Sequence, residues 1–311
     1  MAINLTDPVF TDENKARIHL EAIRWPHGPV CPHCGNADTK RIYGIAANPA
    51  KKIRAGLREC GECGEQFTVQ TGSVMESSHV PLNKWVLAYR LMASAKKGIS
   101  AHQMHRTIGV TYKTAWFMCH RIRESMREIN PTPLGGKGKI VEADETYVGG
   151  KPRRGGRKSM FGRGTKKIPV VALIERGGRA RAVSTPDAKA ETLTKLIRAN
   201  VDKRSKFMTD EWRPYIVVGR DFKGGHHRVE HGAGVYAKGE AHVNSAEGFF
   251  GLFKRGIVGS FHHVSAQHID RYCDEFAFRW SLREIDDTAR AVAAIKGAEG
   301  KRLTYRNPRS T

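Results

Sequence analysis

The 311-residue sequence has too few acidic residues to balance its basic ones. Lys and Arg number 53, Asp and Glu only 31, and the formal net charge is +22. Such an excess is costly in self-repulsion unless a polyanion neutralises it. Nucleic acid is the commonest such partner, because phosphate contacts release counterions. A basic protein without a polyanionic partner, or one that meets anionic membranes, is the alternative, but the charge favours nucleic-acid binding.

Long apolar runs, a secretory start and abundant cysteine are also missing. The longest apolar run, Ile168 to Ile174, has the length of a strand and contains Pro169, whereas a membrane-spanning helix needs about 20 apolar residues. Residues 1–13 carry acids and no basic residue ahead of an apolar core, so we expect no secretory signal. Six cysteines in so long a chain argue against a disulfide scaffold. We therefore expect no membrane association and a cytoplasmic location, at the nucleoid if the partner is DNA.

Four of the six cysteines form two Cys-x-x-Cys-Gly pairs, 25 residues apart: Cys31, Cys34, Cys60 and Cys63. Four thiolates suit one tetrahedral structural Zn²⁺, and the glycine after each pair lets backbone amides turn toward the sulfurs. Two unrelated redox motifs or free thiols are the alternative, which the repeated pattern disfavours. Strand-like stretches at 40–43, 57–58 and 66–69 complete a zinc ribbon, whose core is too small to fold without the metal.

Three helical patterns follow the ribbon. The first covers 83–96; the second starts at Ser100, a good N-cap, and reaches Ile108; the third starts at Thr111 and reaches Arg127. A short helix, a glycine-containing turn and a longer helix predict a helix-turn-helix. Its third helix suits the major groove, and its predicted DNA contacts are Lys113, Arg121 and Arg123. A plain three-helix bundle with a basic solvated face is the alternative.

Composition thus divides the chain into four segments. The run PTPLGGKG at 131–138 is the clearest boundary, and the short apolar runs after it alternate with helical patterns, as in an α/β unit. The predicted segments are a zinc ribbon at 1–78, a helix-turn-helix domain at 79–130, an α/β domain at 139–285 and a basic C-terminal tail at 286–311. The tail is small and polar, and we expect it to fray or to cross onto another subunit.

Three acids stand out in the α/β segment. Asp144 lies in the strand-like run KIVEADETYV, Asp210 ends the run KFMTD, and Glu247 lies in the helical pattern NSAEGFF. Acids in a central strand are expensive unless they bind cations. Acids at the ends of two strands and on a following helix can converge on two divalent cations about 3.5–4 Å apart. Taken singly, each is more often a cap or a surface charge, so the spacing alone is weak support.

Longer stretches around these residues resemble a known family. The segments VCPHCG, CGECGEQFTVQTGS, VEADETYVGGKPRR, MTDEWRPY, HVNSAEGFFGLFKRGIVGSFHHVS and HIDRYCDEFAFRW occur in this order. They are similar to the bacterial insertion-sequence transposases of the DDE superfamily, specifically the fifteen-ninety-five group, over nearly the whole chain. The chain departs from the family pattern at Ser281, where we expect Asn, and members vary between Glu and Asn at the third acid.

The resemblance implies an RNase H-like catalytic domain, with a mixed five-stranded sheet flanked by helices. It also implies dependence on Mg²⁺ (or Mn²⁺), two ions per active site, and cleavage and joining at terminal inverted repeats. Matched residue by residue, it assigns Asp144, Asp210 and Glu247 as catalytic metal ligands.

Basic residues near these acids extend the predicted DNA surface. Residues 151–167 include eight Lys or Arg, which we interpret as a loop along phosphates rather than a disordered charged insertion. The predicted contacts there are Arg153, Arg154, Arg157 and Lys158. Lys254 and Arg255 follow Glu247 by two helical turns and are predicted to hold the DNA backbone beside the metals.

The sequence therefore predicts a DNA transposase. It would bind the terminal inverted repeats of an insertion sequence and carry out metal-dependent 3′-end cleavage and strand transfer into double-stranded target DNA, as a homodimer or higher homo-oligomer. The alternative from another class is a DNA-binding regulator, with the ribbon and helix-turn-helix attached to an inactive nuclease-like domain. A structure-specific nuclease would share the metal site but release its products unjoined.

Overall fold

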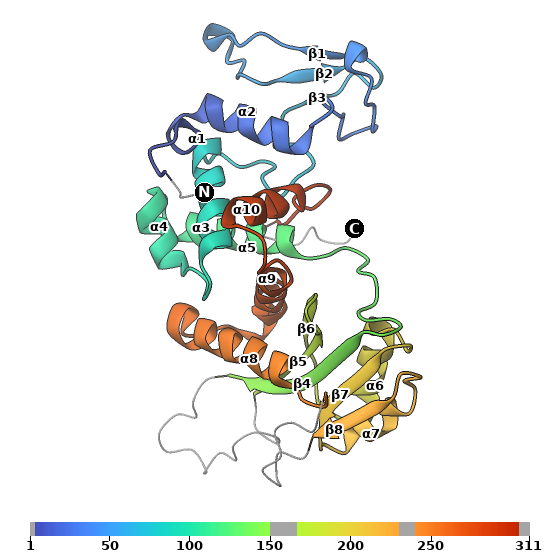
Figure 1. The fold of residues 1–311 in the computed structure, drawn as a ribbon. Helices are drawn as coiled ribbons and strands as arrows, with labels where there is room; N and C mark the ends of the chain where they lie inside the picture. The colour runs from blue at the N-terminus through green and yellow to red at the C-terminus, as the bar shows by residue number, and fades with distance from the viewer. Residues whose placement is uncertain (1–3, 150–166, 230–239, 305–311) are drawn as a thin grey trace, which may run out of the picture. The chain divides into compact units, whose positions relative to one another are not determined.

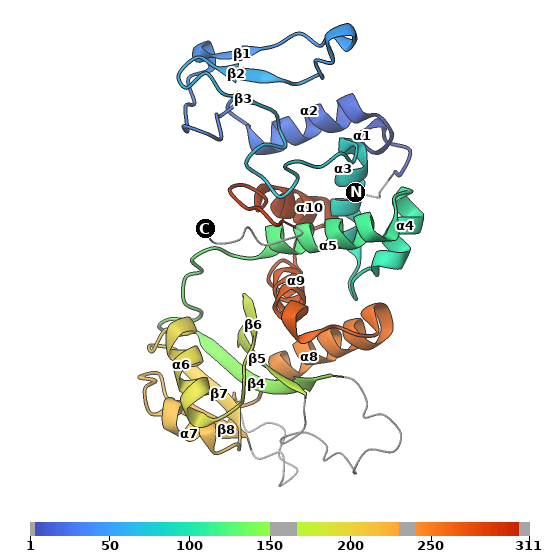
Figure 2. The same ribbon diagram turned by 180° about the vertical axis from the view of Figure 1, so that it is seen from behind.

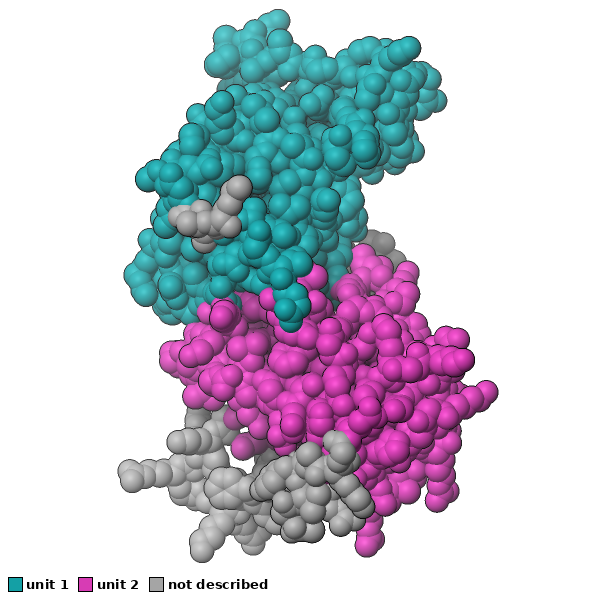
Figure 3. Space-filling view, viewed as in Figure 1, with its two compact units in different colours: residues 1–95, 99–127, 284–311 teal, residues 96–98, 128–283 magenta. Residues whose placement is uncertain are grey.

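A computed structural model describes residues 4–149, 167–229 and 240–304 (Figure 1, and from behind in Figure 2). The chain forms two compact units, which Figure 3 distinguishes by colour. Unit 1 comprises residues 1–95, 99–127 and 284–311, and unit 2 comprises residues 96–98 and 128–283. Among the described helices, none is long and apolar enough to cross a membrane.

Unit 1 opens with two helices and a small antiparallel sheet. The helices are α1 (Pro8–Thr11) and α2 (Glu13–Arg24), and the strands, in the order β1-β2-β3, are β1 (Ile42–Gly44), β2 (Arg58–Cys60) and β3 (Gln66–Phe67). Asp12 caps α2 by accepting a hydrogen bond from the Lys15 amide at 2.7 Å, and Ala16 and Leu20 are buried. The three strands overlap the stretches predicted for the ribbon, 40–43, 57–58 and 66–69.

The rest of unit 1 contains the helices α3 (Leu82–Ser94), α4 (Ala101–Ile108), α5 (Tyr112–Met126) and α10 (Asp287–Lys296). The caps of α4 and α5 are those expected, because Ser100 accepts from the Gln103 amide at 3.1 Å and Thr111 from the Thr114 amide at 3.2 Å. Gly109 has a φ of +63° between these helices, a conformation that favours glycine.

The segment assigned to a basic tail contains helix α10. Asp286 caps it by accepting from the Ala289 amide at 2.8 Å, and the helix packs against α3 within unit 1. Arg290 donates to the Ala93 carbonyl at 3.0 Å. Because α10 contributes buried Ala291, Ala294 and Ile295 to unit 1, residues 287–296 are part of a packed core rather than a frayed end.

Unit 2 is built on a mixed five-stranded sheet in the order β6-β5-β4-β7-β8. Its strands are β4 (Ile140–Val148), β5 (Ile168–Glu175), β6 (Ala180–Ser184), β7 (Lys206–Asp210) and β8 (His226–Val229). β4 runs parallel to β7, and β7 parallel to β8, whereas β5 is antiparallel to both β4 and β6. This order and these directions confirm the predicted RNase H-like sheet.

Helices cover both faces of this sheet: α6 (Ala190–Asn200), α7 (Pro214–Gly219), α8 (Asn244–Gly256) and α9 (Ile269–Ser281). Side chains of β4 alternate between the two faces. Val141 and Ala143 share a core with α6 and α7, whereas Val148 lies in the core that contains the phenylalanines of α8. The even-numbered positions of this strand therefore face α8.

Candidate metal centres

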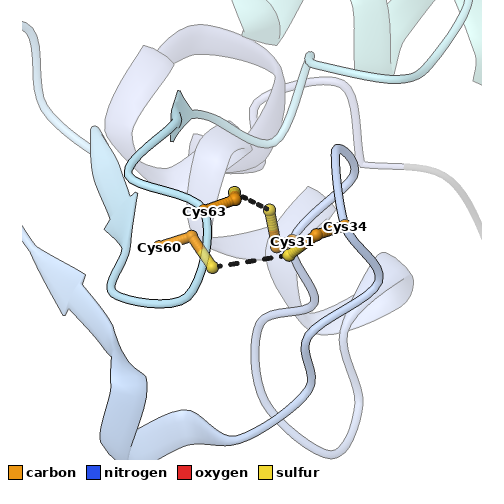
Figure 4. Close-up of side chains that lie close together, drawn as sticks. All are labelled: Cys31, Cys34, Cys60 and Cys63. Carbon is orange, nitrogen blue, oxygen red and sulfur yellow. Dashed lines mark hydrogen bonds between the residues drawn. The ribbon is translucent and has the colours of Figure 1, made fainter.

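The four paired cysteines lie together at the ribbon (Figure 4). Their sulfurs are all within 4.8 Å of one another, and the Sγ–Sγ distance is 3.7 Å both for Cys31 and Cys63 and for Cys34 and Cys60. A tetrahedral zinc site with bonds of about 2.3 Å places its sulfurs about 3.8 Å apart. The geometry of the thiols therefore fits one structural Zn²⁺, and the predicted four-cysteine zinc ribbon is confirmed.

The two cysteine turns are built alike. The amide of Gly35 donates to the Cys31 carbonyl at 2.9 Å, and the amide of Gly64 to the Cys60 carbonyl at 2.7 Å. Both glycines have a positive φ, +77° and +74°, as their predicted role requires. Amides of Cys63 and Glu62 donate to the Cys60 sulfur and lower the pKa of that thiol to about 6, whereas desolvation and hydrogen bonds among the thiols raise the pKa of Cys34 and Cys63. The amides stabilise the Cys60 thiolate, and a bound metal would favour the thiolate form of all four.

The three predicted catalytic acids lie on the α8 side of the sheet. Glu142 of β4 is paired with Met208 of β7, so Asp144 and Asp210, each two residues further along parallel strands, extend from neighbouring positions on one face. Glu247 lies in the first turn of α8 and is exposed, and α8 packs against β4 and β5. The fold therefore brings together residues that are 66 and 37 positions apart in the sequence.

Electrostatics identify Asp144 as the centre of this group. Burial raises the pKa of its carboxyl to about 7, and the negative charges of Glu145, Asp210 and Glu247 add to the increase. A divalent cation would remove this penalty, because its own charge dominates the local field. Carboxylates are also the oxygen donors that Mg²⁺ and Mn²⁺ prefer.

The acids are more widely spaced than the cysteines. Among the described residues, only the cysteines form a set of three or more ligands within 4.8 Å of one another. A two-metal site divides its ligands between ions about 3.5–4 Å apart, so ligands of different ions need not approach so closely. The donor types and the charge of the acidic centre fit divalent cations, and the ligand assignment stays a prediction.

Glu145 belongs to the opposite face of β4. It accepts a hydrogen bond from the hydroxyl of the fully buried Tyr215 at 2.8 Å. Burial and the negative charge of Glu145 raise the pKa of Tyr215 well above its ordinary value. The Tyr215 hydroxyl therefore stays protonated and holds Glu145 away from the α8 side.

Sequence reasoning assigned no role to an ion pair near Asp144 whose acidic member is buried. Arg176 Nε donates to Glu142 Oε1 at 2.8 Å, and Glu142 is fully buried. The signal available was the position of Glu142, two residues before Asp144 and therefore on the same face of the strand. Its partner follows β5 and could not be located from spacing.

The predicted DNA-contact residues fall into three groups. Lys113 is exposed in the first turn of α5, and Lys254 and Arg255 are exposed near the end of α8. Lys254 and Arg255 line a cleft of about 570 Å³ together with Lys97. Four further predicted contacts lie outside the described residues: Arg153, Arg154, Arg157 and Lys158.

Arg121 and Arg123 form the third group, with exposures of only 7% and 2%. Arg121 donates to the carbonyls of Glu76 at 3.0 Å and Leu303 at 3.2 Å, and its guanidinium lies 4.6 Å from the ring centre of Phe117. Both arginines occupy the C-terminal half of α5, inside unit 1. Arg121 thus ties α5 to distant segments of unit 1, and neither arginine faces solvent in this structure.

Ser281, where the family pattern led us to expect Asn, has a clear partner. Its Oγ accepts a hydrogen bond from the Ala180 amide at 3.0 Å. The residue thereby ties the C-terminal end of α9 to the start of β6, an edge strand of the sheet. A small hydroxyl side chain therefore serves a structural purpose at this position.

Comparison with known proteins gives two family matches and, among individual proteins, the two matches described below. Residues 133–281 match the ISXO2-like transposase domain, and residues 11–66 match the transposase zinc-ribbon domain. A protein of Halobacterium salinarum, described as an uncharacterized protein in transposable element ISH50, is 32% identical over 284 residues, covering 87% of this chain and 91% of that protein. A solved structure, the Mos1 strand transfer complex, matches 70% of this chain and 79% of its own at 12% identity and a TM-score of 0.29, too low to support an argument.

Proposed function

Because the chain belongs to the insertion-sequence transposases that carry an ISXO2-like transposase domain, we propose that it cuts the ends of its element and joins them to target DNA. The observation that supports this most directly is the acidic centre. Asp144, Asp210 and Glu247 come from two strands and a helix. Burial, together with the negative charges of Glu145, Asp210 and Glu247, raises the pKa of Asp144 to about 7. A regulator with an inactive domain has no need of so costly a cluster.

The three acids would hold Mg²⁺ (or Mn²⁺), two ions per active site. Asp144, whose pKa responds to both other acids, would contact both ions, and Asp210 and Glu247 would each complete one. When bound, such ions activate the attacking oxygen and stabilise the leaving oxygen. The protein's own contribution is to fix the three carboxylates on one rigid face.

The proposed reaction has two phosphoryl-transfer steps. In the first, the oxygen of water attacks the phosphorus at the transposon end, the P–O3′ bond breaks, and the element keeps a free 3′-hydroxyl. In the second, that hydroxyl attacks a phosphorus of target DNA in line, and a target 3′-hydroxyl leaves. Both steps need little covalent chemistry from the protein, so positioning and charge carry the catalysis.

Unit 1 offers a second DNA surface at the start of α5. From Ser77 to Arg123 the chain contains no Asp or Glu. The exposed rings of His102 and Tyr112 stack with their centres 4.2 Å apart, next to the exposed side chain of Lys113. The first residues of a recognition helix are those that reach base edges. We therefore place the sequence-reading contacts here and not at the buried Arg121 and Arg123.

The test separates DNA binding from chemistry. We expect Asp144→Ala to bind duplexes containing the element ends normally but to produce neither nicks nor joined products with Mg²⁺ or Mn²⁺. Asp202→Asn is the matched control. Asp202 lies just before β7, at the end of that strand opposite Asp210, and accepts a hydrogen bond from the Arg204 amide. Normal joining by Asp144→Ala would contradict the assignment. Sequence-specific binding without metal-dependent cleavage by the unmodified protein would favour the regulator.

A further inference from the structure

Glu142 is a fully buried carboxylate at the edge of the acidic centre. It lies on β4 two residues before Asp144, with no exposed surface. Burial of a carboxylate is expensive unless each oxygen is paired. Both oxygens of Glu142 are paired, and most of their partners belong to the start of α8.

One Glu142 oxygen caps α8. Oε2 accepts from the backbone amides of Ser245 at 2.7 Å and Ala246 at 3.1 Å, and Oε1 accepts from the Ser245 hydroxyl at 3.0 Å. Amides in the first turn of a helix have no partner within the helix and attract negative charge. The residue at the N-cap position is Val243, which provides no side-chain hydrogen bond. Glu142 therefore supplies from a strand the cap that the helix lacks.

This cap controls the position of Glu247. Ser245, Ala246 and Glu247 belong to the same helical turn, and the Glu247 amide donates to the Val243 carbonyl at 3.0 Å. Glu142 thus connects the strand that carries Asp144 directly to the turn that carries Glu247. A shift of this turn would change the distance between the two acids.

Arg176 completes the connection from β5. Its Nε donates to Glu142 Oε1 at 2.8 Å, its Nη1 to the Glu240 carbonyl at 3.1 Å, and its Nη2 to the His242 carbonyl at 3.2 Å. The guanidinium therefore balances the charge of Glu142 and holds the segment that leads into α8. With these partners, Glu142 is engaged by the protein and is not available as a further metal ligand.

We propose that Glu142, held by Arg176, is a positioning residue that sets Glu247 for divalent-cation binding. This inference rests on the proposed function, because it concerns the same metal site. Its distinguishing consequence is that Glu142 acts through Glu247. A buried ion pair with a purely structural role would affect folding without this dependence.

The test is a double-mutant cycle read out by Mn²⁺ binding, measured by electron paramagnetic resonance on the full zinc-loaded chain. Glu142→Gln keeps the size of the side chain, but it replaces one accepting oxygen by an amide N–H₂ group that faces other hydrogen-bond donors. We expect it to weaken Mn²⁺ binding about tenfold, as substitutions behind metal ligands commonly do. In a Glu247→Gln background the same change should weaken the remaining Mn²⁺ binding less than about twofold, because interacting residues are not additive.

A second buried acid provides the matched control. Glu175 on β5 is 7% exposed, and it accepts from Lys139 Nζ at 2.6 Å and from the Gly135 amide at 3.0 Å, with no hydrogen bond to α8. Glu175→Gln should lower the unfolding temperature as Glu142→Gln does, yet leave Mn²⁺ binding unchanged. Arg176→Lys, which keeps the charge but loses the forked contacts, should weaken Mn²⁺ binding in the same direction as Glu142→Gln.

The outcomes distinguish the inference from the function on which it rests. Equal losses of Mn²⁺ affinity in both backgrounds, or no loss with Glu142→Gln, would overturn the positioning role even if the protein cleaves and joins DNA. Failure of the unmodified protein to cut DNA, with the cycle as expected, would overturn the proposed function and leave the positioning role standing.

Discussion

In the folded chain without metal, the carboxyl group of Asp144 favours its protonated form. Burial and three neighbouring acids raise its pKa to about 7, from an ordinary value of 3.8. The folded chain therefore holds a proton there more tightly than the unfolded chain does. The contribution of this proton to stability is fully present below pH 3.8 and is lost as the pH rises toward 7.

We accordingly expect Asp144→Asn to be more stable than the unmodified protein at pH 8. With one pKa unit worth about 1.4 kcal/mol and some solvent screening, the gain in free energy of unfolding should be about 2 kcal/mol. It should disappear near pH 4. Urea unfolding of the zinc-loaded protein at the two pH values, without added Mg²⁺ or Mn²⁺, measures the difference. A variant that is no more stable at pH 8 would show that Asp144 carries no such penalty.

The roles of some single residues could be predicted from the sequence, and those of others could not. The cysteines could be found because identical spacing and the following glycines mark both turns. Arg121 and Arg123 could not be distinguished from Lys113 by charge, since burial of an arginine depends on carbonyls that come from distant segments. For Arg121 these are Glu76 and Leu303, 45 residues before and 182 after it.

At the scale of elements, local capping chemistry was the most reliable guide. Ser100, Thr111 and Gly109 mark the ends of α4 and α5 in the sequence and in the structure. Helix α10 has the same kind of signal, Asp286 followed by an alanine-rich run, but it was included in a segment defined by its charge. The capping of α8 by Glu142 could not be read from the sequence, because the cap lies 103 residues before Ser245.

The ribbon provides a prediction at this scale. Cys34→Ser should remove one equivalent of Zn²⁺ and the amide protection of β1, β2 and β3, because their small core depends on the metal. Helices α3, α4 and α5, which have their own buried core, should keep their protection. Metal analysis and hydrogen exchange measure both effects.

His33→Ala is the control for the ribbon, since His33 is exposed between two ligands and should be dispensable. Loss of zinc from His33→Ala, or retention of one full equivalent by Cys34→Ser, would contradict the four-cysteine site.

The net charge of the whole molecule is +22, and only the structure shows where its exposed basic residues lie. Unit 1 has an acid-free stretch that includes the exposed start of α5, and unit 2 has Lys254 and Arg255 in a cleft. Composition predicted the partner, and the fold selects which basic residues can reach it. The sheet topology followed from the family resemblance, because spacing alone cannot fix the order of five strands.

The salt dependence of DNA affinity should show whether Lys254 and Arg255 contact DNA phosphates. Lys254→Ala and Arg255→Ala should each reduce the slope of log affinity against log salt by about 0.9, the loss of one phosphate contact. Lys195→Ala is the control, because Lys195 is an exposed lysine of α6, on the other face of the sheet. Fluorescence anisotropy between 50 and 200 mM salt is suitable. Equal slopes for all three variants would remove this cleft from the DNA surface.

The central claim is that Asp144, Asp210 and Glu247 form one strand-transfer centre. The most direct measurement is joining of a pre-cut element end to plasmid DNA with Mg²⁺, for the unmodified chain and for Asp144→Asn, Asp210→Asn, Glu247→Gln and Glu211→Gln. We predict joined products from the unmodified chain and from Glu211→Gln, the neighbour of Asp210, and none above background from the other three. Joining by any of those three at the rate of the unmodified chain would contradict the claim.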